Sequence, residues 1–454
     1  TEEIIVRLND GSFAYDVHSL FQAFYPQTRI SVRTKAEAQG EADFLMEEAH
    51  DADWVIAVFD GKVSVWEKGR EDDAGDDWQE KGKRRIARGE ETGGGVFSRA
   101  DVKNRLKRAI YVALSQKEGR TLSWGTLTGI RPTKLALRQL MDDATDDAIC
   151  AFMRETYLAS EEKTALAIRI AKREKEILTT IPHLREGYSL YIGIPFCPSI
   201  CLYCSFSTFP LARWKDKVED YISALEKEMS FCGEAMKKKT LQTVYIGGGT
   251  PTTLNKDQLK RLFDMTEKYF DTSEVLEWTI EAGRPDSLDR EKLEVIKASG
   301  ANRISINPQT MNNETLKLIG RHHFAEDFTE KFQLARSMGI DNINTDIILG
   351  LPKEGREELK VTLDKLKELA PDSLTVHSLA LKRAAKLSQK ADILNPLYDA
   401  QSAMEQAFLA AREMGAAPYY LYRQKNMTGN LENIGFAKEG RECLYNILIM
   451  EEKQ

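Results

Sequence analysis

The sequence lacks long apolar runs, a strong positive charge and an abundance of cysteine. No apolar stretch approaches the roughly 20 residues that a membrane-spanning helix needs, so we expect no membrane association. The net charge is −7 at pH 7, which argues against a nucleic acid as the main partner. Only six of the 454 residues are cysteine, and the charge-rich start shows no signal peptide. These features favour a cytoplasmic protein over a disulfide-stabilised secreted one.

Three of the cysteines stand close together. Cys197, Cys201 and Cys204 follow a short apolar run. Three thiolates on one loop, with no fourth at usable spacing, suit a four-iron four-sulfur cluster that keeps one iron free of protein ligands. Structural zinc is the first alternative, but it normally takes four ligands in paired CxxC motifs, and no second pair is present. The remaining cysteines are expected to pack as small buried hydrophobes; they are Cys150, Cys232 and Cys443.

The chain is long enough for two or three domains. Residues 187–380 alternate short apolar runs with amphipathic stretches, which is the pattern of βα units around a parallel sheet. Six such units predict an α/β fold, a partial (β/α)6 barrel of the TIM type. The predicted strands are Leu190–Ile194, Thr243–Ile246, Glu277–Ile280, Arg303–Ile306, Asn342–Leu349 and Ser373–His377.

The regions on either side of the barrel are predicted to be separate. Residues 1–100 are expected to form an α+β module, and residues 101–186 a helical region that begins at Asp101, which can cap a helix. Residues 381–454 are expected to form a C-terminal α/β extension, with no obvious final element after Met450. In the module we predict the strand Glu3–Leu8 and the helix Tyr15–Phe24. They are followed by a hairpin of Asp53–Phe59 and Val63–Trp66, turned at Asp60-Gly61, and by a mobile loop over residues 67–92. In the helical region, further helices are predicted over residues 134–178.

Polar and glycine residues gather where the predicted strands end, which is the rim that carries the active site in parallel barrels. The second strand is followed by Gly247–Pro251, GGGTP, whose missing side chains allow close approach of the backbone to a ligand. The third strand ends in Glu281, which can accept hydrogen bonds from hydroxyls or an amine. In the fourth, Arg303, Ser305 and Asn307 share one face. Asp346 lies in an apolar run, where an unpaired carboxylate is costly, so we expect it to bind a ligand or a cation.

The spacing CxxxCxxC after an apolar strand resembles the radical S-adenosylmethionine (SAM) superfamily. With its companion motifs, it resembles one branch in particular, the oxygen-independent coproporphyrinogen III oxidases and their relatives, and most of all the coproporphyrinogen dehydrogenases among them. The resemblance runs from about residue 187 to 380. Its motifs are Tyr191, GGGTPT from Gly247, Glu281, NRISIN from Asn302, Gln309, Arg321 and NTDIILGLP from Asn344, and it extends to Trp124–Lys134 and Tyr419–Asn433.

The resemblance implies a set of site residues. The three cysteines would hold one four-iron four-sulfur cluster, and a first SAM would lie near Tyr191, Gly248 and Glu281, with Arg303 as a further cofactor-binding candidate. The oxidases carry another cysteine two residues after the third ligand, whereas Phe206 stands here, as in haem chaperone relatives. The sequence therefore leaves open whether one SAM binds or two. A second SAM would map to Tyr203, Gly249, Thr250, Gln309, Arg321, Asp346 and Ala380.

The chemistry implied by the resemblance is reductive cleavage of SAM to a 5′-deoxyadenosyl radical, which removes hydrogen from a substrate propionate so that carbon dioxide leaves and a vinyl group remains. The expected partners are a tetrapyrrole substrate and an electron donor such as flavodoxin or ferredoxin. Carboxylates of the substrate need cations, and arginine suits them. Arg131, Arg321 and Arg423 are candidates, although Arg131 and Arg423 more often have a surface or structural role.

Two other classes of function stay open. The first is a haem-binding chaperone, or a radical SAM protein that modifies haem or another tetrapyrrole without oxygen. The second is a radical SAM enzyme acting on RNA, for which the sequence offers neither a basic stripe nor a run of stacking aromatics.

Overall fold

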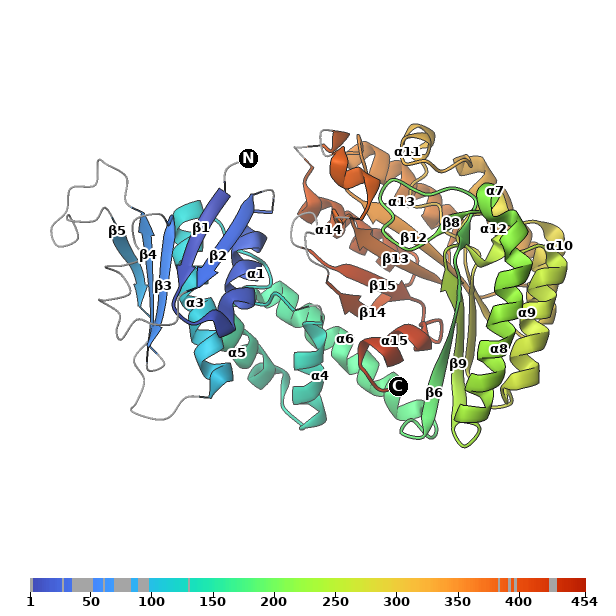
Figure 1. Ribbon diagram of the computed structural model, residues 1–454, viewed down its shortest axis with the longest axis horizontal. Coiled ribbons are helices and arrows are strands. Elements are labelled where there is room, and N and C mark those ends of the chain that lie inside the picture. Colours follow the sequence, from blue (N-terminus) through green and yellow to red (C-terminus); the bar gives the residue numbers. More distant parts are fainter. Residues whose placement is uncertain are drawn as a thin grey trace. The chain divides into compact units, whose positions relative to one another are not determined.

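The computed structural model describes residues 3–26, 28–34, 52–59, 62–68, 83–88, 98–129, 131–382, 384–390, 393–395, 398–423 and 431–454. They belong to two compact units, one of residues 1–132 with 142–168 and one of residues 133–141 with 169–454 (Figure 1). The boundary falls within helix α6 (Glu161–Thr180).

The first unit is an α+β module built on a five-stranded sheet. The strand order is β2 (Arg29–Thr34), β1 (Glu3–Leu8), β3 (Trp54–Phe59), β4 (Lys62–Lys68) and β5 (Lys83–Arg88). β1 runs parallel to β2 and β3, and the other pairs are antiparallel. Helices α1 (Ala14–Phe24), α3 (Arg99–Glu118) and α5 (Asp146–Tyr157) complete the unit. Side chains such as Val6, Phe21 and Ile110 form its core.

Several predictions for this unit are confirmed and others are wrong. The strand at Glu3–Leu8 has the predicted bounds, and α1 and the β3–β4 hairpin are present. β2 was not predicted, and β5 lies in the segment expected to be a loop. Asp60 and Gly61, the predicted turn, lie outside the described residues. The cap of α3 is Ser98, whose hydroxyl accepts a hydrogen bond from the Asp101 amide while Asp101 Oδ2 accepts from the Ser98 amide.

The second unit contains the predicted half-barrel. Six parallel strands stand in the order β13, β12, β11, β10, β9, β6, and the antiparallel strands β15 and β14 extend the sheet beyond β13. Their bounds are β6 (Gly187–Ile194), β9 (Thr240–Gly248), β10 (Glu277–Glu281), β11 (Arg303–Ser305), β12 (Ile343–Leu349), β13 (Ser373–Ser378), β14 (Ala417–Tyr422) and β15 (Asn433–Ala437). Each parallel strand contains one of the predicted strands or most of it, so the six predictions are confirmed.

Helices connect these strands and cover one side of the sheet (Figure 1). The connecting helices are α7 (Leu211–Trp214), α8 (Val218–Met236), α9 (Lys256–Tyr269), α10 (Arg290–Ala298), α11 (Asn313–Leu318), α12 (Ala325–Ser337) and α13 (Arg356–Leu369). The unit also contains α4 (Thr133–Met141), α14 (Ala400–Glu413) and α15 (Leu444–Met450). Helix α15 was not predicted; it ends at Met450, after which no further helix or strand is found in the described residues, and its Ile447 and Leu448 are buried.

Helix α9 illustrates why these segments are helical. Asn255 and Gln258 form a reciprocal capping box, which satisfies amides that the first turn leaves without partners. Leu259, Leu262 and Phe263 recur at helical spacing and are buried. Burial of each such side chain stabilises the fold by roughly 1.5–3 kcal/mol. The helix therefore draws its stability mainly from its packing face.

Candidate functional site

The cysteine loop is fastened to the glycine loop of the neighbouring strand. The amide of Gly249 donates to the Ile194 carbonyl at 2.7 Å, and the amide of Thr250 donates to the Phe196 carbonyl at 2.7 Å. A Cβ on Gly249 would lie 2.6 Å from the Phe196 oxygen and 3.0 Å from Cys197 Sγ. Both contacts are too short, so glycine is required here by close approach to the first cysteine rather than by a turn.

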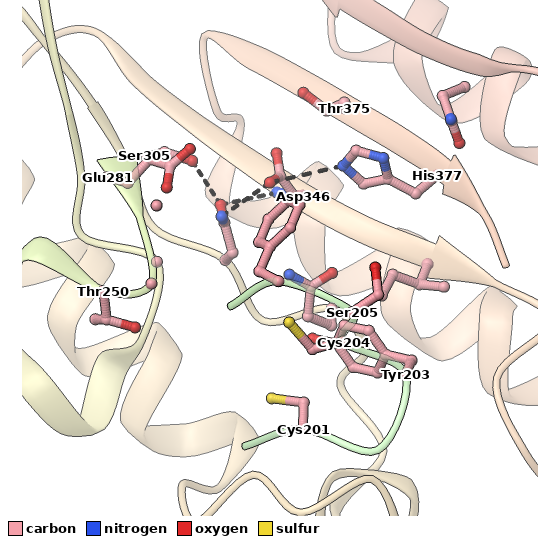
Figure 2. Close-up of a pocket in the computed structure, with 18 of the residues that line it drawn as sticks. Cys201, Tyr203, Cys204, Ser205, Thr250, Glu281, Ser305, Asp346, Thr375 and His377 are labelled. Atoms are coloured by element: carbon pink, nitrogen blue, oxygen red, sulfur yellow. Dashed lines mark hydrogen bonds and ion pairs between the residues drawn. The ribbon is translucent and has the colours of Figure 1, made fainter. Parts of the chain in front are cut away.

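The three cysteines line one cavity of about 480 Å³. In Figure 2 the sulfur atoms of Cys201 and Cys204 point from their loop toward the space bordered by Thr250 and Glu281. Burial raises the pKa of the Cys197 thiol, which the hydrogen bond from the Thr250 hydroxyl, at 3.5 Å, partly offsets. Burial also raises the pKa of the Cys204 thiol. These thiols therefore need a positively charged partner to become thiolates.

The arrangement of the cysteines fits a cluster better than a single ion. A zinc ion draws its cysteine ligands to about 2.3 Å from one point, whereas a four-iron cluster accepts its thiolates at separate corners. Three thiols on one cavity wall, with a glycine cradle beside them, suit the second case.

Arg284 lies against the cysteine loop and was not foreseen from the sequence. It is 4% exposed, and its guanidinium binds the Asp286 carboxylate through two hydrogen bonds of 2.9 and 2.7 Å. The same guanidinium donates to Ser199 Oγ at 3.2 Å and lies 3.7 Å from Cys201 Sγ. Arg284 therefore places a permanent positive charge beside the cysteine loop.

Glu281 ends β10 and forms one wall of the cavity (Figure 2). The Tyr245 hydroxyl donates to Glu281 Oε1 at 2.7 Å. Burial raises the pKa of Glu281 to about 7, although the hydrogen bond from Tyr245 opposes this shift. Glu281 is therefore partly protonated near neutral pH, and it can either accept or donate a hydrogen bond to a ligand.

Tyr245 is also part of a cluster of three tyrosine rings. Its ring centroid lies 4.6 Å from that of Tyr445 on α15 and 5.9 Å from that of Tyr191 on β6. Tyr191 is 48% exposed and is not among the residues that line the cavity. Tyr191 thus contacts Tyr245, which lines the cavity, but does not line the cavity itself.

Asp346 lies at the middle of β12 and lines the cavity. Its carboxylate accepts from the side-chain amides of Asn344 at 2.7 Å and Asn307 at 2.8 Å, and it lies 3.7 Å from His377 Nε2 (Figure 2). Burial alone would raise the pKa of Asp346, but the interaction with His377 and the hydrogen bonds from Asn344 and Thr375 hold it below the usual value. We expected a ligand or a cation to compensate the charge of Asp346, and the protein itself provides part of this compensation through these side chains.

Gln309 and Arg321 line the cavity near the ends of β10, β11 and β12. Arg321 donates to the carbonyls of Gly283 at 2.7 Å and Asn307 at 2.9 Å. Gln309 has a positive φ of 68°, which is strained for a residue with a side chain. Its Oε1 is buried without a hydrogen-bond partner among the described residues. A buried acceptor on a strained backbone is the arrangement expected where a ligand donates the missing hydrogen bond.

The cavity brings together most of the predicted site residues. Three of them do not line it: Tyr191, Arg131 and Arg423. Arg131 belongs to the first unit. Arg423 is buried, and this burial lowers its pKa to about 10. The lining contains the three cysteines with Tyr203, Gly248, Gly249, Thr250, Glu281, Arg303, Gln309, Arg321, Asp346 and Ala380.

Several other residues at the site were not predicted from the sequence. Arg284 and His377 line the cavity, as do Asn446 and Met450 from α15. His323, expected to be a loop residue, is only 2% exposed, and both its ring nitrogens lack a hydrogen-bond partner among the described residues. Burial and the nearby Arg321 lower the pKa of His323 to about 3. It is therefore a neutral part of the wall behind the cavity.

Among the described helices, none is both long enough and apolar enough to cross a lipid bilayer.

Comparison with known proteins gives consistent matches. A family model, the radical SAM superfamily, matches residues 191–366. The oxygen-independent coproporphyrinogen-III oxidase-like protein HemZ of Bacillus subtilis is 40% identical over 358 residues, which are 78% of this chain and 72% of that protein. The heme chaperone HemW of Bacillus subtilis is 33% identical over 270 residues, 59% of this chain and 68% of that protein. The solved structure of coproporphyrinogen III oxidase (HemN) from Escherichia coli, a radical SAM enzyme, aligns with a TM-score of 0.50 and 27% identity over 59% of each chain.

Proposed function

Because this chain belongs to the radical SAM superfamily, and within it to the oxygen-independent coproporphyrinogen III oxidase-like branch, we propose that it catalyses the oxidative decarboxylation of coproporphyrinogen III propionates to vinyl groups without oxygen. Membership of the superfamily implies a four-iron four-sulfur cluster and SAM as cofactors. The observation that carries the proposal is the single cavity that combines the cysteine loop with the polar ends of the parallel strands.

The residues of the cavity have distinct roles in this proposal. When bound, the reduced cluster and SAM supply a one-electron oxidant for an unactivated C–H bond. Cys197, Cys201 and Cys204 would hold the cluster, and Gly249 leaves room beside the first of them. Glu281, kept in place by Tyr245, offers a hydrogen-bonding group for ribose hydroxyls or an amine. The buried walls exclude water from the reacting atoms.

The proposed reaction balances for each propionate. One hydrogen atom leaves the side chain, carbon dioxide follows, and one further electron passes to an acceptor. A carbon–carbon double bond then remains as the vinyl group. Two propionates would react in turn, toward protoporphyrinogen IX. The cluster needs a one-electron donor such as flavodoxin or ferredoxin, and one SAM or two would bind in the cavity.

The experiment is anaerobic reconstitution with iron, sulfide, SAM, a reductant and coproporphyrinogen III. We expect vinyl-bearing products and one carbon dioxide for each propionate lost. Cys204→Ser should abolish both products, whereas Cys232→Ser on α8, outside the cavity, should not. A reconstituted protein that holds its cluster and cleaves SAM without forming any vinyl product would contradict the proposal.

A haem chaperone is the second candidate. It is favoured by the similarity to HemW and by Phe206, which stands where the oxidases carry another cysteine. In that case the chain would bind haem in a one-to-one ratio, and coproporphyrinogen would not stimulate SAM cleavage. Haem titration followed by absorbance, in parallel with the product assay, separates the two functions.

A further inference from the structure

An exposed aromatic ring and a lysine lie at the edge of the cavity. Phe206 is 66% exposed, although it follows the cysteine loop and lines the cavity. Lys382 lines the same cavity, and its Nζ lies 5.9 Å from the centre of the Phe206 ring. The ammonium group and the ring attract each other, and together they present an aromatic face and a positive charge to a ligand in the cavity.

The segment that follows Lys382 packs against the cysteine loop. The chain around Lys382 is tied to the cysteine loop by a hydrogen bond from the Leu387 amide to the Leu202 carbonyl at 2.9 Å. Leu379 and Leu387 are buried in one hydrophobic cluster, against which Leu202 packs. The loop that carries Phe206 and the segment that carries Lys382 are therefore neighbours, which places the ring and the ammonium group beside the same cavity.

Lys382 differs from the arginines of the cavity in its partners. Arg284 is paired with Asp286, and Arg321 donates to two carbonyls. Within the described part of the chain, no hydrogen bond or ion pair to a carboxylate is found for Lys382; its ammonium group contacts the Phe206 ring and interacts electrostatically with Cys204. Its ammonium group is thus available to a carboxylate from outside the protein.

We infer that Phe206 and Lys382 form a subsite for the carboxylate-bearing edge of a tetrapyrrole, with the ring of Phe206 against a pyrrole face and Lys382 on a propionate. This inference rests on the proposed function, since it names the part of the site that receives the substrate. Contact between the two ring faces accounts for recognition of one pyrrole ring of the tetrapyrrole, and the ammonium group accounts for selection of an acidic side chain.

The test uses the reconstituted holoprotein and two stable probes: coproporphyrin III, with four carboxylates, and its neutral tetra-amide. Binding is measured by quenching of porphyrin fluorescence. We expect Lys382→Met to weaken coproporphyrin III binding about tenfold, a loss of roughly 1.4 kcal/mol, and to change tetra-amide binding less than twofold. Phe206→Leu should weaken binding of both probes about fivefold.

Two control variants, Lys386→Met and Phe231→Leu, remove an exposed lysine and an exposed phenylalanine outside the cavity. They should change the binding of neither probe.

The carboxylate could also come from the methionyl group of SAM, so SAM binding to each variant is measured by equilibrium dialysis. A loss of SAM affinity in Lys382→Met, with coproporphyrin III binding unchanged, would overturn the inference. Equal weakening of the binding of both probes in Lys382→Met, weakening of the binding of neither, or no binding of coproporphyrin III to the unsubstituted chain would overturn it as well.

If the unsubstituted chain forms vinyl product while the variants bind both probes normally, the subsite fails and the proposed function stands. If the expected binding pattern appears without any vinyl product, the proposed function fails and the subsite stands.

Discussion

Glu281 is the carboxyl group of the cavity that stays protonated to near-neutral pH. Because its folded-state pKa is raised to about 7, against about 4.3 in an unfolded chain, the folded state keeps its proton after the unfolded state has lost it. The stability that this proton contributes is complete below about pH 4 and is lost as the pH rises through 7.

We expect Glu281→Gln to become more stable relative to the unsubstituted chain between pH 5 and pH 8. The gain should be roughly 1–2 kcal/mol, less than the full shift implies because the group is partly solvated. Thermal unfolding of both proteins at the two pH values measures it. Glu267→Gln, which changes an exposed carboxylate on α9, is the control. A difference that does not vary with pH would contradict the expected protonation of Glu281.

Substitution of Gly249 is expected to affect both stability and cluster binding. In Gly249→Ala the new Cβ would meet the Phe196 carbonyl at 2.6 Å, and both are held by backbone, so the glycine loop must move away from Cys197. We expect a destabilisation of about 1–3 kcal/mol and a reduced iron content after reconstitution. Iron analysis and thermal unfolding test this. Gly129→Ala, where a Cβ meets open space, should lose no iron, and normal iron in Gly249→Ala would show that the close approach is unimportant.

Which site residues could be predicted depends on how local their signal is. The cysteines, the glycine loop and Glu281 each follow a strand directly, so the position of the strand places them. Arg284 reaches Ser199 and Cys201 from more than 80 residues away in sequence, and no spacing rule connects them. Tyr191 was expected near SAM; it pairs in register with Tyr245, which lines the cavity, but it lies one strand farther out, on the edge strand β6, and alternation along a strand does not show strand order.

Among the elements, α15 contributes most to the site without being expected there. The Glu277 carboxylate of β10 accepts from the amides of Leu444 at 2.7 Å and Tyr445 at 3.3 Å, and from Cys443 Sγ at 3.3 Å. These bonds satisfy amides at the start of the helix and place a negative charge at its positive end. Asn446 and Met450 reach the cavity from the same helix.

We expect Glu277→Gln to loosen α15, at a cost of about 1–3 kcal/mol, because the buried charged acceptor is lost. Cys443 is 0% exposed, so its alkylation rate, followed by mass spectrometry of its peptide, reports the opening of the helix. The rate should rise in the variant, while that of the half-buried Cys232 on α8 stays constant as an internal reference. Glu274→Gln, at an exposed loop position, is the control. An unchanged rate at Cys443 would mean that Glu277 does not hold α15.

A strand can be predicted from the sequence when it buries several apolar side chains, and it is missed when it buries few. The six parallel strands contain buried apolar residues at regular positions, such as Ile280 in β10, Ile304 in β11 and Ile347 in β12, as strands covered on one or both faces tend to do. In β2, RISVRT, only Ile30 is buried, so its pairing with β1 has almost no hydrophobic signature. β5, KRRIAR, is still more basic. Such edge strands are specified by backbone pairing with a neighbour, which composition does not show.

At the scale of the whole molecule, the two compact units predict separate responses to a ligand. SAM that binds only the folded second unit stabilises that unit by mass action, by about 2.7 kcal/mol at 100 times its Kd. We expect scanning calorimetry of the reconstituted protein to show one transition that moves upward with SAM concentration and one that does not. The Cys204→Ser variant should show no shift. A shift of both transitions together would mean that the units unfold as one cooperative body.

The packing of Tyr191, Tyr245 and Tyr445 provides the protein with an optical reporter of its own. Because the phenol of Tyr245 donates to a carboxyl group that ionises near neutrality, its near-ultraviolet absorption changes as that group loses its proton. The two neighbouring rings couple to the same transition and raise its circular dichroism. Titration of this signal follows the ionisation of the cavity wall in unlabelled protein, and displacement of the hydrogen bond by a bound cofactor becomes visible without any assay of turnover.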